Sequence, residues 1–195
     1  MEQRSPFGEM ADDHMALVVD MGDLQEAIRR LAQPDAAGLS SGRQILDTLD
    51  VFQWRLRVHF RREEEGVFPE AQRMVSEGAQ GADVFGRFFG EEAEDDMSAH
   101  ATLARRTGEM IDIATRMADA GVPDQVSARR LLALVDLTAN LLQRHADKED
   151  RLIFPMIEKS LTTQQVGEVR DRLRKIPTER DLGPPGEEHL GQLGA

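Results

Sequence analysis

The core-facing residues of this chain recur at intervals of three and four, the spacing that places side chains along one face of an α-helix. A first helix is predicted over about residues 10–33, and its inner face carries His14, Leu17, Val18, Met21, Leu24, Ile28 and Leu31. A second helix begins near residue 42, after turn-forming residues at 34–41, and presents Ile45, Leu49, Phe52, Leu56, His59 and Glu63. Both apolar series therefore include polar side chains that point toward the core.

The same pattern occurs again in the second part of the chain. A third helix is predicted to start between Asp83 and Glu91 and to end around 121–123, with His100, Leu103, Thr107, Met110, Ala114 and Met117 on its inner face. A fourth helix opens near Asp124 or Ser127 and presents Leu131, Val135, Thr138, Leu142, His145 and Glu149. The pattern predicts an all-α protein, an antiparallel up-down four-helix bundle with an internal two-fold repeat.

Turn and cap signals divide the chain further. Pro69 has no backbone N–H to donate, so we expect a kink or local break there, with helix continuing to about Glu77 and a connector at 78–81. Thr162 and Gln165 have the spacing of a capping box and predict a short C-terminal helix to about Lys175. The predicted organisation is an N-terminal segment 1–9, a bundle 10–160, a short helix 161–176 and a disordered or loosely attached tail 177–195, which contains a non-functional His189.

The polar residues of the inner faces repeat with a constant offset of 86 residues. The matching pairs are His14 with His100, His59 with His145, and Glu63 with Glu149. A Phe-Pro pair follows each His-x-x-x-Glu motif, at 68–69 and at 154–155. An approximate two-fold symmetry would bring four imidazoles and two carboxylates to one level of the core.

Buried imidazoles and carboxylates are unfavourable unless they are paired, hydrogen-bonded or bound to metal. A carboxylate can bridge two cations, and imidazole nitrogen suits iron, zinc, copper or nickel, so these six residues predict a dinuclear metal site. A single His-x-x-x-Glu is more often a surface pair one turn apart, and it is the second copy that favours a site. Glu149 fits better than Asp150, because four residues turn a helix about 40° from His145 whereas five turn it about 140°.

Other acidic residues near the motifs have different interpretations. Glu64, Glu65 and Asp150 are expected on a solvated face or behind the metal ligands. Asp96 lies one turn before His100 and could reach the same site.

Composition excludes several classes of protein. The net charge of −12 and a pI near 4.9 argue against a nucleic-acid partner, which needs a basic surface. The absence of cysteine excludes disulfides, zinc-thiolate sites, iron–sulfur clusters and thiol nucleophiles. The first residues do not form an apolar run, and no segment approaches the about 18 uncharged apolar residues of a membrane span. We expect a cytoplasmic protein without a membrane partner.

The arrangement of His14, His59-x-x-x-Glu63, His100 and His145-x-x-x-Glu149, with both Phe-Pro pairs, resembles the hemerythrin-like (HHE cation-binding) domain family over about residues 10–160. The resemblance implies a non-haem di-iron site with His14 and His59 on one iron, His100 and His145 on the other, and the two glutamates bridging. Ferritin-like bundles instead use Glu-x-x-His, which this chain lacks, and the His-Glu-x-x-His motif of zinc proteases is absent too.

The third helix departs from the pattern of the oxygen-carrying members. Those proteins have five histidines, two of them four residues apart on this helix, whereas here Asp96 and Ala104 flank His100. The difference argues against reversible oxygen carriage. Four-histidine members of the family are interpreted as sensors of iron, oxygen or redox state, or as peroxide-handling proteins.

The resemblance implies a protein that binds oxygen or a related small oxidant, such as O2, H2O2 or NO, for sensing, storage or transport. The first alternative is a di-iron oxidoreductase that decomposes peroxide, with Asp96 or Glu64 as the nearby residues able to relay protons. The second is a metal-free helical interaction module. Zinc or a single iron are the alternative metals, and catalytic residues, a protein partner and the oligomeric state are left unassigned.

Overall fold

A computed structural model describes residues 5–32, 42–76, 82–120 and 125–177, of which 74, 75 and 82–97 are described by their backbone alone. These residues are helical apart from short turns, and no strand occurs among them. The prediction of an all-α protein is therefore confirmed. Within the same described residues, no helix combines the length and the apolar character needed to cross a membrane.

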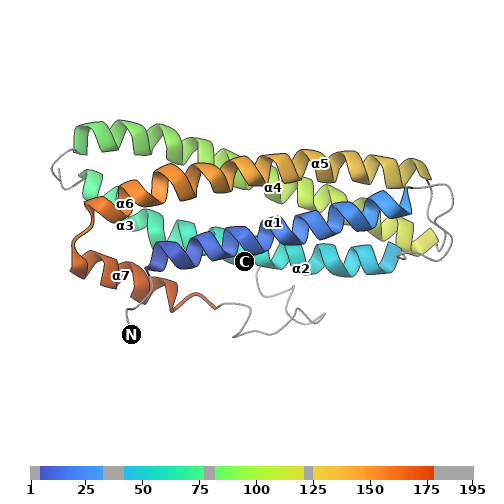
Figure 1. The fold of residues 1–195 in the computed structure, drawn as a ribbon, viewed down its shortest axis with the longest axis horizontal. Coiled ribbons are helices and arrows are strands. Elements are labelled where there is room, and N and C mark those ends of the chain that lie inside the picture. Colours follow the sequence, from blue (N-terminus) through green and yellow to red (C-terminus); the bar gives the residue numbers. More distant parts are fainter. Residues whose placement is uncertain (1–4, 33–41, 77–81, 121–124, 178–195) are drawn as a thin grey trace.

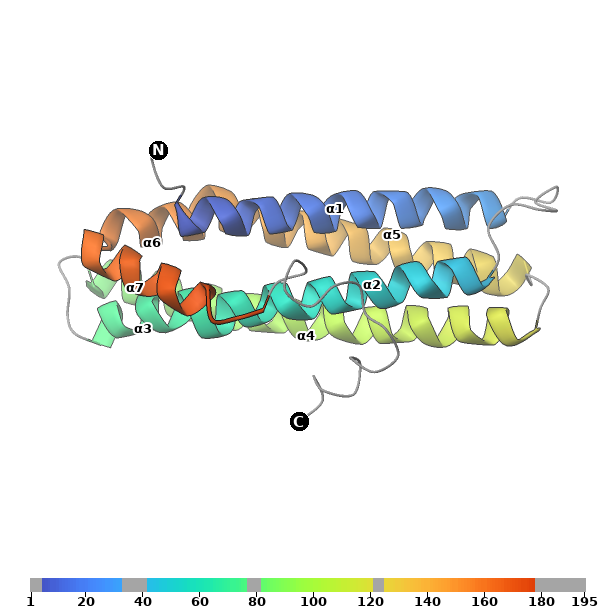
Figure 2. The same ribbon diagram turned by 90° about the horizontal axis from the view of Figure 1, so that it is seen from below.

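Four long helices account for most of the chain. They are α1 (Pro6–Leu31), α2 (Gly42–Arg61), α4 (Ala82–Ala120) and α5 (Gln125–Lys148). Helix α1 packs against α2 and α5, and α4 packs against the same two helices. Figures 1 and 2 show the four lying side by side along the length of the molecule. The shorter elements are η1 (Arg62–Val67), α3 (Phe68–Ser76), η2 (Glu149–Ile153), α6 (Phe154–Ser160) and α7 (Thr163–Leu173).

Two helices begin earlier than the apolar pattern predicts. Helix α1 starts at Pro6 instead of near residue 10, because Ser5 caps it by accepting the backbone N–H of Phe7 at 3.3 Å. Phe7 and Met10 are buried and extend the series of His14 by two further turns. Helix α4 starts at Ala82, just before the predicted interval. Near the C-terminus, the predicted capping box of Thr162 and Gln165 is confirmed at the start of α7.

The apolar core has two parts. The larger cluster lies between α1, α2, α4 and α5 and contains the predicted series of leucine, isoleucine, valine and methionine residues, except that Val18 is only partly buried against it. The smaller one lies at the end of the molecule where α3, α6 and α7 meet, and consists of Phe7, Met10, Val67, Phe68, Ala71, Ile153, Phe154, Ile157, Val169 and Leu173. Along α1, His14 falls between Met10 of the smaller cluster and Leu17 of the larger one. The polar residues thus lie between two apolar layers.

Two π-helical turns, η1 and η2, join α2 to α3 and α5 to α6. The backbone N–H of Phe68 donates to the carbonyl of Glu63, and that of Phe154 donates to the carbonyl of Glu149, in each case five residues back. The prolines that follow, Pro69 and Pro155, lack a backbone N–H, and their rings clash with a carbonyl four residues earlier in a regular α-helix. The break predicted at Pro69 is thus a widened turn just before the proline, and the helix continues to Ser76.

Candidate metal centre

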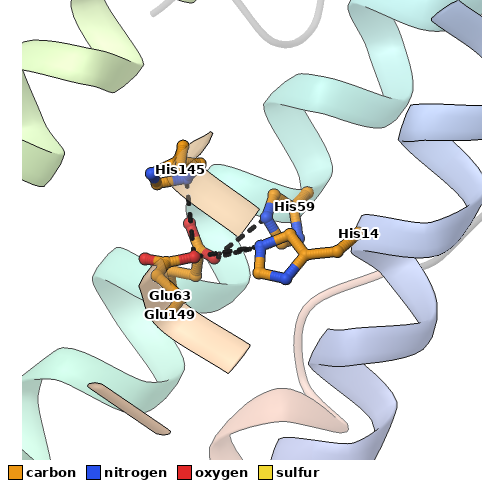
Figure 3. A group of neighbouring side chains, drawn as sticks. All are labelled: His14, His59, Glu63, His145 and Glu149. Atoms are coloured by element: carbon orange, nitrogen blue, oxygen red, sulfur yellow. Dashed lines mark ion pairs between the residues drawn. The ribbon is translucent and has the colours of Figure 1, made fainter. Parts of the chain in front are cut away.

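Five buried side chains from α1, α2, η1, α5 and η2 converge between the two apolar layers. Their potential ligand atoms all lie within 4.8 Å of one another, and the residues are His14, His59, Glu63, His145 and Glu149. Figure 3 shows the three imidazoles pointing at the two carboxylates. Each of the five is at most 3% exposed.

The carboxylate of Glu63 touches imidazoles from three helices. Its Oε1 atom lies 2.9 Å from Nε2 of His59 and 3.4 Å from Nε2 of His14. Its Oε2 atom lies 3.0 Å from Nε2 of His100, which comes from α4. The two oxygens of one glutamate therefore face different sets of histidines.

The carboxylate of Glu149 completes the group. Its Oε2 atom lies 2.9 Å from Nε2 of His14 and 3.5 Å from Nε2 of His145. The ring of His145 is in turn 4.9 Å from that of His100, edge to face. The structure thus brings together all six residues predicted from the sequence, while their role as metal ligands stays a prediction.

The short contacts between these atoms do not have the angles of hydrogen bonds. Among the described residues, no hydrogen-bond partner is found for Nε2 of His14, either ring nitrogen of His59, Nε2 of His100, or any carboxylate oxygen of Glu63 and Glu149. Buried polar atoms are almost always hydrogen-bonded, and each exception calls for an explanation such as an ion. Nitrogen and oxygen lone pairs that converge without bonding one another fit a bound cation.

The spacing of the atoms also fits a metal site. Ligand nitrogen and oxygen atoms lie about 2.1 Å from a first-row divalent ion, so two ligands at right angles are about 3.0 Å apart. The nitrogen–oxygen contacts of the two glutamates fall at 2.9–3.5 Å. Mixed imidazole and carboxylate ligands suit iron, and zinc is compatible with the same donors.

Without a metal, the two glutamates have opposite protonation behaviour. Burial would raise the pKa of Glu63, but the imidazoles of His59, His100 and His14 around it hold that pKa well below its ordinary value. Burial raises the pKa of Glu149, and the charge of Glu63 raises it further, well above the ordinary value. Without a metal, Glu149 therefore holds its proton more tightly than Glu63.

His14 and His100 hold protons tightly because carboxylates lie beside them. Burial would lower the pKa of His14, but Asp150, Glu149 and Glu63 more than offset this and raise it to about 12. Burial also works against protonation of His100, whose pKa the carboxylates of Glu63 and Glu64 raise to about 9. A cation at this site competes with these protons and takes over their role in balancing the carboxylates.

Two further carboxylates orient the outer ring nitrogens. Nδ1 of His14 lies 2.9 Å from Oδ1 of Asp150, and Nδ1 of His100 lies 2.8 Å from Oε1 of Glu64. A ring nitrogen that donates to a carboxylate leaves Nε2 free to bind a metal and fixes the direction of the ring. The sequence predicted these two residues on a solvated face or behind the ligands, and their offset of 86 positions, the same as that of the histidines, is the signal that could have assigned this role.

Arg62 is a buried arginine beside the site, and the apolar pattern of the sequence did not predict its burial. Arg62, the first residue of η1, is 5% exposed and forms ion pairs with Asp13 and with Glu9, the latter at 3.2 Å. Asp13 also lies 3.9 Å from Nδ1 of His59. The ion pair of Arg62 and Asp13 therefore lies beside His59.

Aromatic rings cover two of the histidines. Phe60 stacks on His100 with ring centres 3.8 Å apart, and Phe154 lies parallel to His14 at 5.8 Å. These rings exclude water from the faces of the imidazoles. The predicted contact of Asp96 with the site lies outside the residues whose side chains are described.

An all-helical protein with this buried histidine and glutamate cluster fits the class of metal-binding proteins. Residues 5–96 match the family described as the Hemerythrin HHE cation binding domain. The resemblance predicted from the motifs is thereby confirmed. The matched segment includes His14, His59 and Glu63, and their counterparts follow it. A comparison with curated protein sequences gave no match.

Proposed function

We propose that this protein is a hemerythrin-like di-iron protein that binds oxygen or a related small oxidant, such as peroxide or nitric oxide, for sensing, storage or transport. His14 and His59 would hold one iron, His100 and His145 the other, and Glu63 and Glu149 would bridge. The proposal includes an antiparallel up-down four-helix bundle whose two halves are related by an approximate two-fold axis.

One observation carries this proposal: the two oxygens of Glu63 face different histidines. Oε1 is close to His14 and His59, whereas Oε2 is close to His100. This supports one cation on each side of a bridging carboxylate. The contacts of Glu149 with His14 and His145 support a second bridge between the same two sides.

Two reduced iron ions, when bound, supply the electrons and the coordination positions with which dioxygen or peroxide reacts. The chain's own residues prepare that site. Asp150 and Glu64 hold the rings of His14 and His100 with Nε2 toward the centre. Phe60 and Phe154 cover imidazole faces and keep water away from them. Arg62 balances the acidic residues next to His59.

Peroxide decomposition at the same centre is the alternative, and the position of Glu64 favours it. This carboxylate is 37% exposed and lies 2.8 Å from Nδ1 of His100, so it connects a buried ring with solvent. A group in that position can exchange protons between the site and water, which turnover of peroxide requires.

Rapid mixing of the iron-loaded protein with oxygen or peroxide tests the two functions. A binder or sensor gives one optical change per centre with oxygen, without sustained consumption. An enzyme releases oxygen from peroxide over many turnovers, and Glu64→Gln slows that release when it is compared with the wild type at equal iron content. Protein that neither changes its spectrum nor consumes either oxidant contradicts both functions.

The remaining expectations on partners and location stay predictions. The net charge of −12 supports the expectation that nucleic acid is not a partner. We also propose a cytoplasmic location and no membrane partner, which fractionation of the native cells would test.

A further inference from the structure

The C-terminal helix α7 packs directly on the π-helical turn η1, which carries Glu63. Figures 1 and 2 both show α7 beside α3, at the end of the molecule where η1 leads into that helix. Val169 and Leu173 of α7 are buried with Val67, Phe68 and Ala71 in the smaller apolar cluster. The turn that presents one predicted bridging carboxylate is therefore covered by a separate helix.

Gly66 permits this close approach. A Cβ atom at this position would lie 2.5 Å from Cδ2 and 3.2 Å from Cγ of Leu173, both shorter than ordinary contacts. The second half of the chain differs at the matching position, 86 residues on, where η2 has Leu152. That leucine is 40% exposed. Of the two π-turns, only η1 has a glycine at this position, and α7 packs against its backbone.

Arg172 of α7 bonds to both sides of the same turn. Its Nε donates to the carbonyl oxygen of Gly66 at 3.0 Å, inside η1. Its Nη2 donates to Oε2 of Glu70 at 3.1 Å, in the first turn of α3. Glu70 is 1% exposed and also pairs with Arg73, so the guanidinium enters a fixed network. A planar guanidinium that donates in two directions holds its partners at a set separation.

We infer that Arg172 is a positioning residue, and that α7 acts through it as a clamp that holds η1, and thereby Glu63, in the geometry required at the metal centre. A π-helical turn is rare and occurs mostly as a single turn inside an α-helix, so we expect the packing around it to hold it in place. The clamp supplies that packing on the Glu63 side. The inference rests on the proposed function insofar as it assigns Glu63 to a metal.

The consequence is an asymmetric centre. Glu63 touches His14, His59 and His100, and its turn is held by Arg172 and Leu173. Glu149 lies on η2, whose Leu152 is exposed.

The test compares Arg172→Ala with Arg174→Ala in the full-length protein. Arg174 is a matched control, since it lies on the same helix end, is 62% exposed and pairs with the exposed Asp171. The first readout is amide hydrogen exchange of Phe68 and Phe154 in the metal-free protein, because each amide donates across its own π-turn. The second readout is a titration with Co²⁺ under anaerobic conditions, followed by its absorption bands.

The clamp predicts that Arg172→Ala speeds exchange at Phe68 by about tenfold, with Phe154 unchanged, and weakens Co²⁺ binding by about tenfold with a shifted band. Arg174→Ala leaves both readouts unchanged. Arg172→Lys keeps the positive charge next to Glu70 and so preserves the fold. Its exchange rate and Co²⁺ affinity fall between those of the wild type and Arg172→Ala, because one ammonium replaces the guanidinium that donates to both Gly66 and Glu70.

Equal acceleration at Phe68 and Phe154, or none at Phe68, would overturn the clamp. Faster exchange at Phe68 with unaltered Co²⁺ binding would overturn the positioning of Glu63. Wild-type protein that binds no Co²⁺ would contradict the proposed function, and the two amide rates decide the clamp in that case as well.

Discussion

Oδ1 of Asp150 lies 2.9 Å from Nδ1 of His14, although the two residues belong to opposite halves of the chain. Glu64, 86 residues before Asp150, makes the matching contact with His100 at 2.8 Å. Each half therefore supplies the acidic residue that orients a histidine of the other half. This exchange makes the two halves dependent on each other for the geometry of the centre.

Removing one of these carboxylates weakens metal binding without unfolding the protein. We expect Asp150→Ala to lower iron affinity by about 10–100-fold, because the ring of His14 loses the partner that fixes its direction and basicity. Asp147→Ala is the control, since Asp147 is 45% exposed and pairs with Arg151 on the surface. Equal affinities of the two variants in an iron titration would refute this role of Asp150.

Glu63 and Glu149 differ in the metal-free protein. Glu63→Gln removes a charge that three imidazoles stabilise, and we expect it to reduce the free energy of unfolding by about 3 kcal/mol. Glu149→Gln replaces a group whose pKa is already raised by burial and by the charge of Glu63, so its effect is within about 1 kcal/mol. Both variants lose iron. Urea unfolding of the metal-free proteins distinguishes them, and similar losses of stability in both would contradict the assigned protonation states.

The stability of the metal-free protein depends on pH through His14 and His100. Despite burial, nearby carboxylates raise the pKa of His100 from its ordinary 6.5 to about 9. The folded protein thus holds the proton more tightly, so this stabilisation is complete below pH 6.5 and is lost as pH rises toward 9. The raised pKa values of His14 and Glu149 act in the same direction. We expect a loss on the order of 3 kcal/mol for His100 alone.

Urea unfolding between pH 6.5 and pH 9 checks the sign of this dependence. Metal binding has the opposite trend, because the cation displaces protons and binds more tightly as pH rises. The stabilisation that iron provides therefore grows from pH 6.5 to pH 9. Metal-free protein whose stability rises over this range would show that the histidines are not held protonated by the carboxylates.

Two consecutive arginines differ in their effect on stability. Arg62 is 5% exposed and pairs with Asp13 and Glu9, so Arg62→Ala removes a buried stem and leaves acidic groups uncompensated. We expect a loss of about 2 kcal/mol. Arg61 is 42% exposed and pairs with Glu65 on the surface, so Arg61→Ala changes stability by less than about 0.5 kcal/mol. Thermal unfolding measures the difference, and equal effects would count against a role for Arg62.

Most of the fold and the central cluster could be predicted because the buried residues of a helix recur at regular intervals in the sequence. The apolar series that contains Leu49, Phe52 and Leu56 continues directly into His59 and Glu63, so those polar residues had to face the core. The constant offset of 86 residues then indicated which residues of the second half meet them. Periodicity and repetition together are sufficient to place the six residues of the cluster on their helices.

The remaining features depend on contacts that periodicity does not encode. The π-turns follow from Pro69 and Pro155, but a proline signals only a disturbed helix and not its form. From the sequence alone, Arg62 is expected on the surface. In the structure, the widened turn and the acidic residues of α1 enclose it. The packing of α7 on Gly66 is a relation between residues far apart in the sequence, and a glycine alone does not indicate what lies against it.

Iron content together with the optical spectrum of anaerobic and air-exposed protein tests the central claim most directly. The account predicts two iron ions per chain after anaerobic reconstitution, loss of this iron in Glu63→Ala and His145→Ala, and a change in the spectrum when air is admitted. The account would be contradicted if the protein held no metal after reconstitution and if both variants were as stable as the wild type.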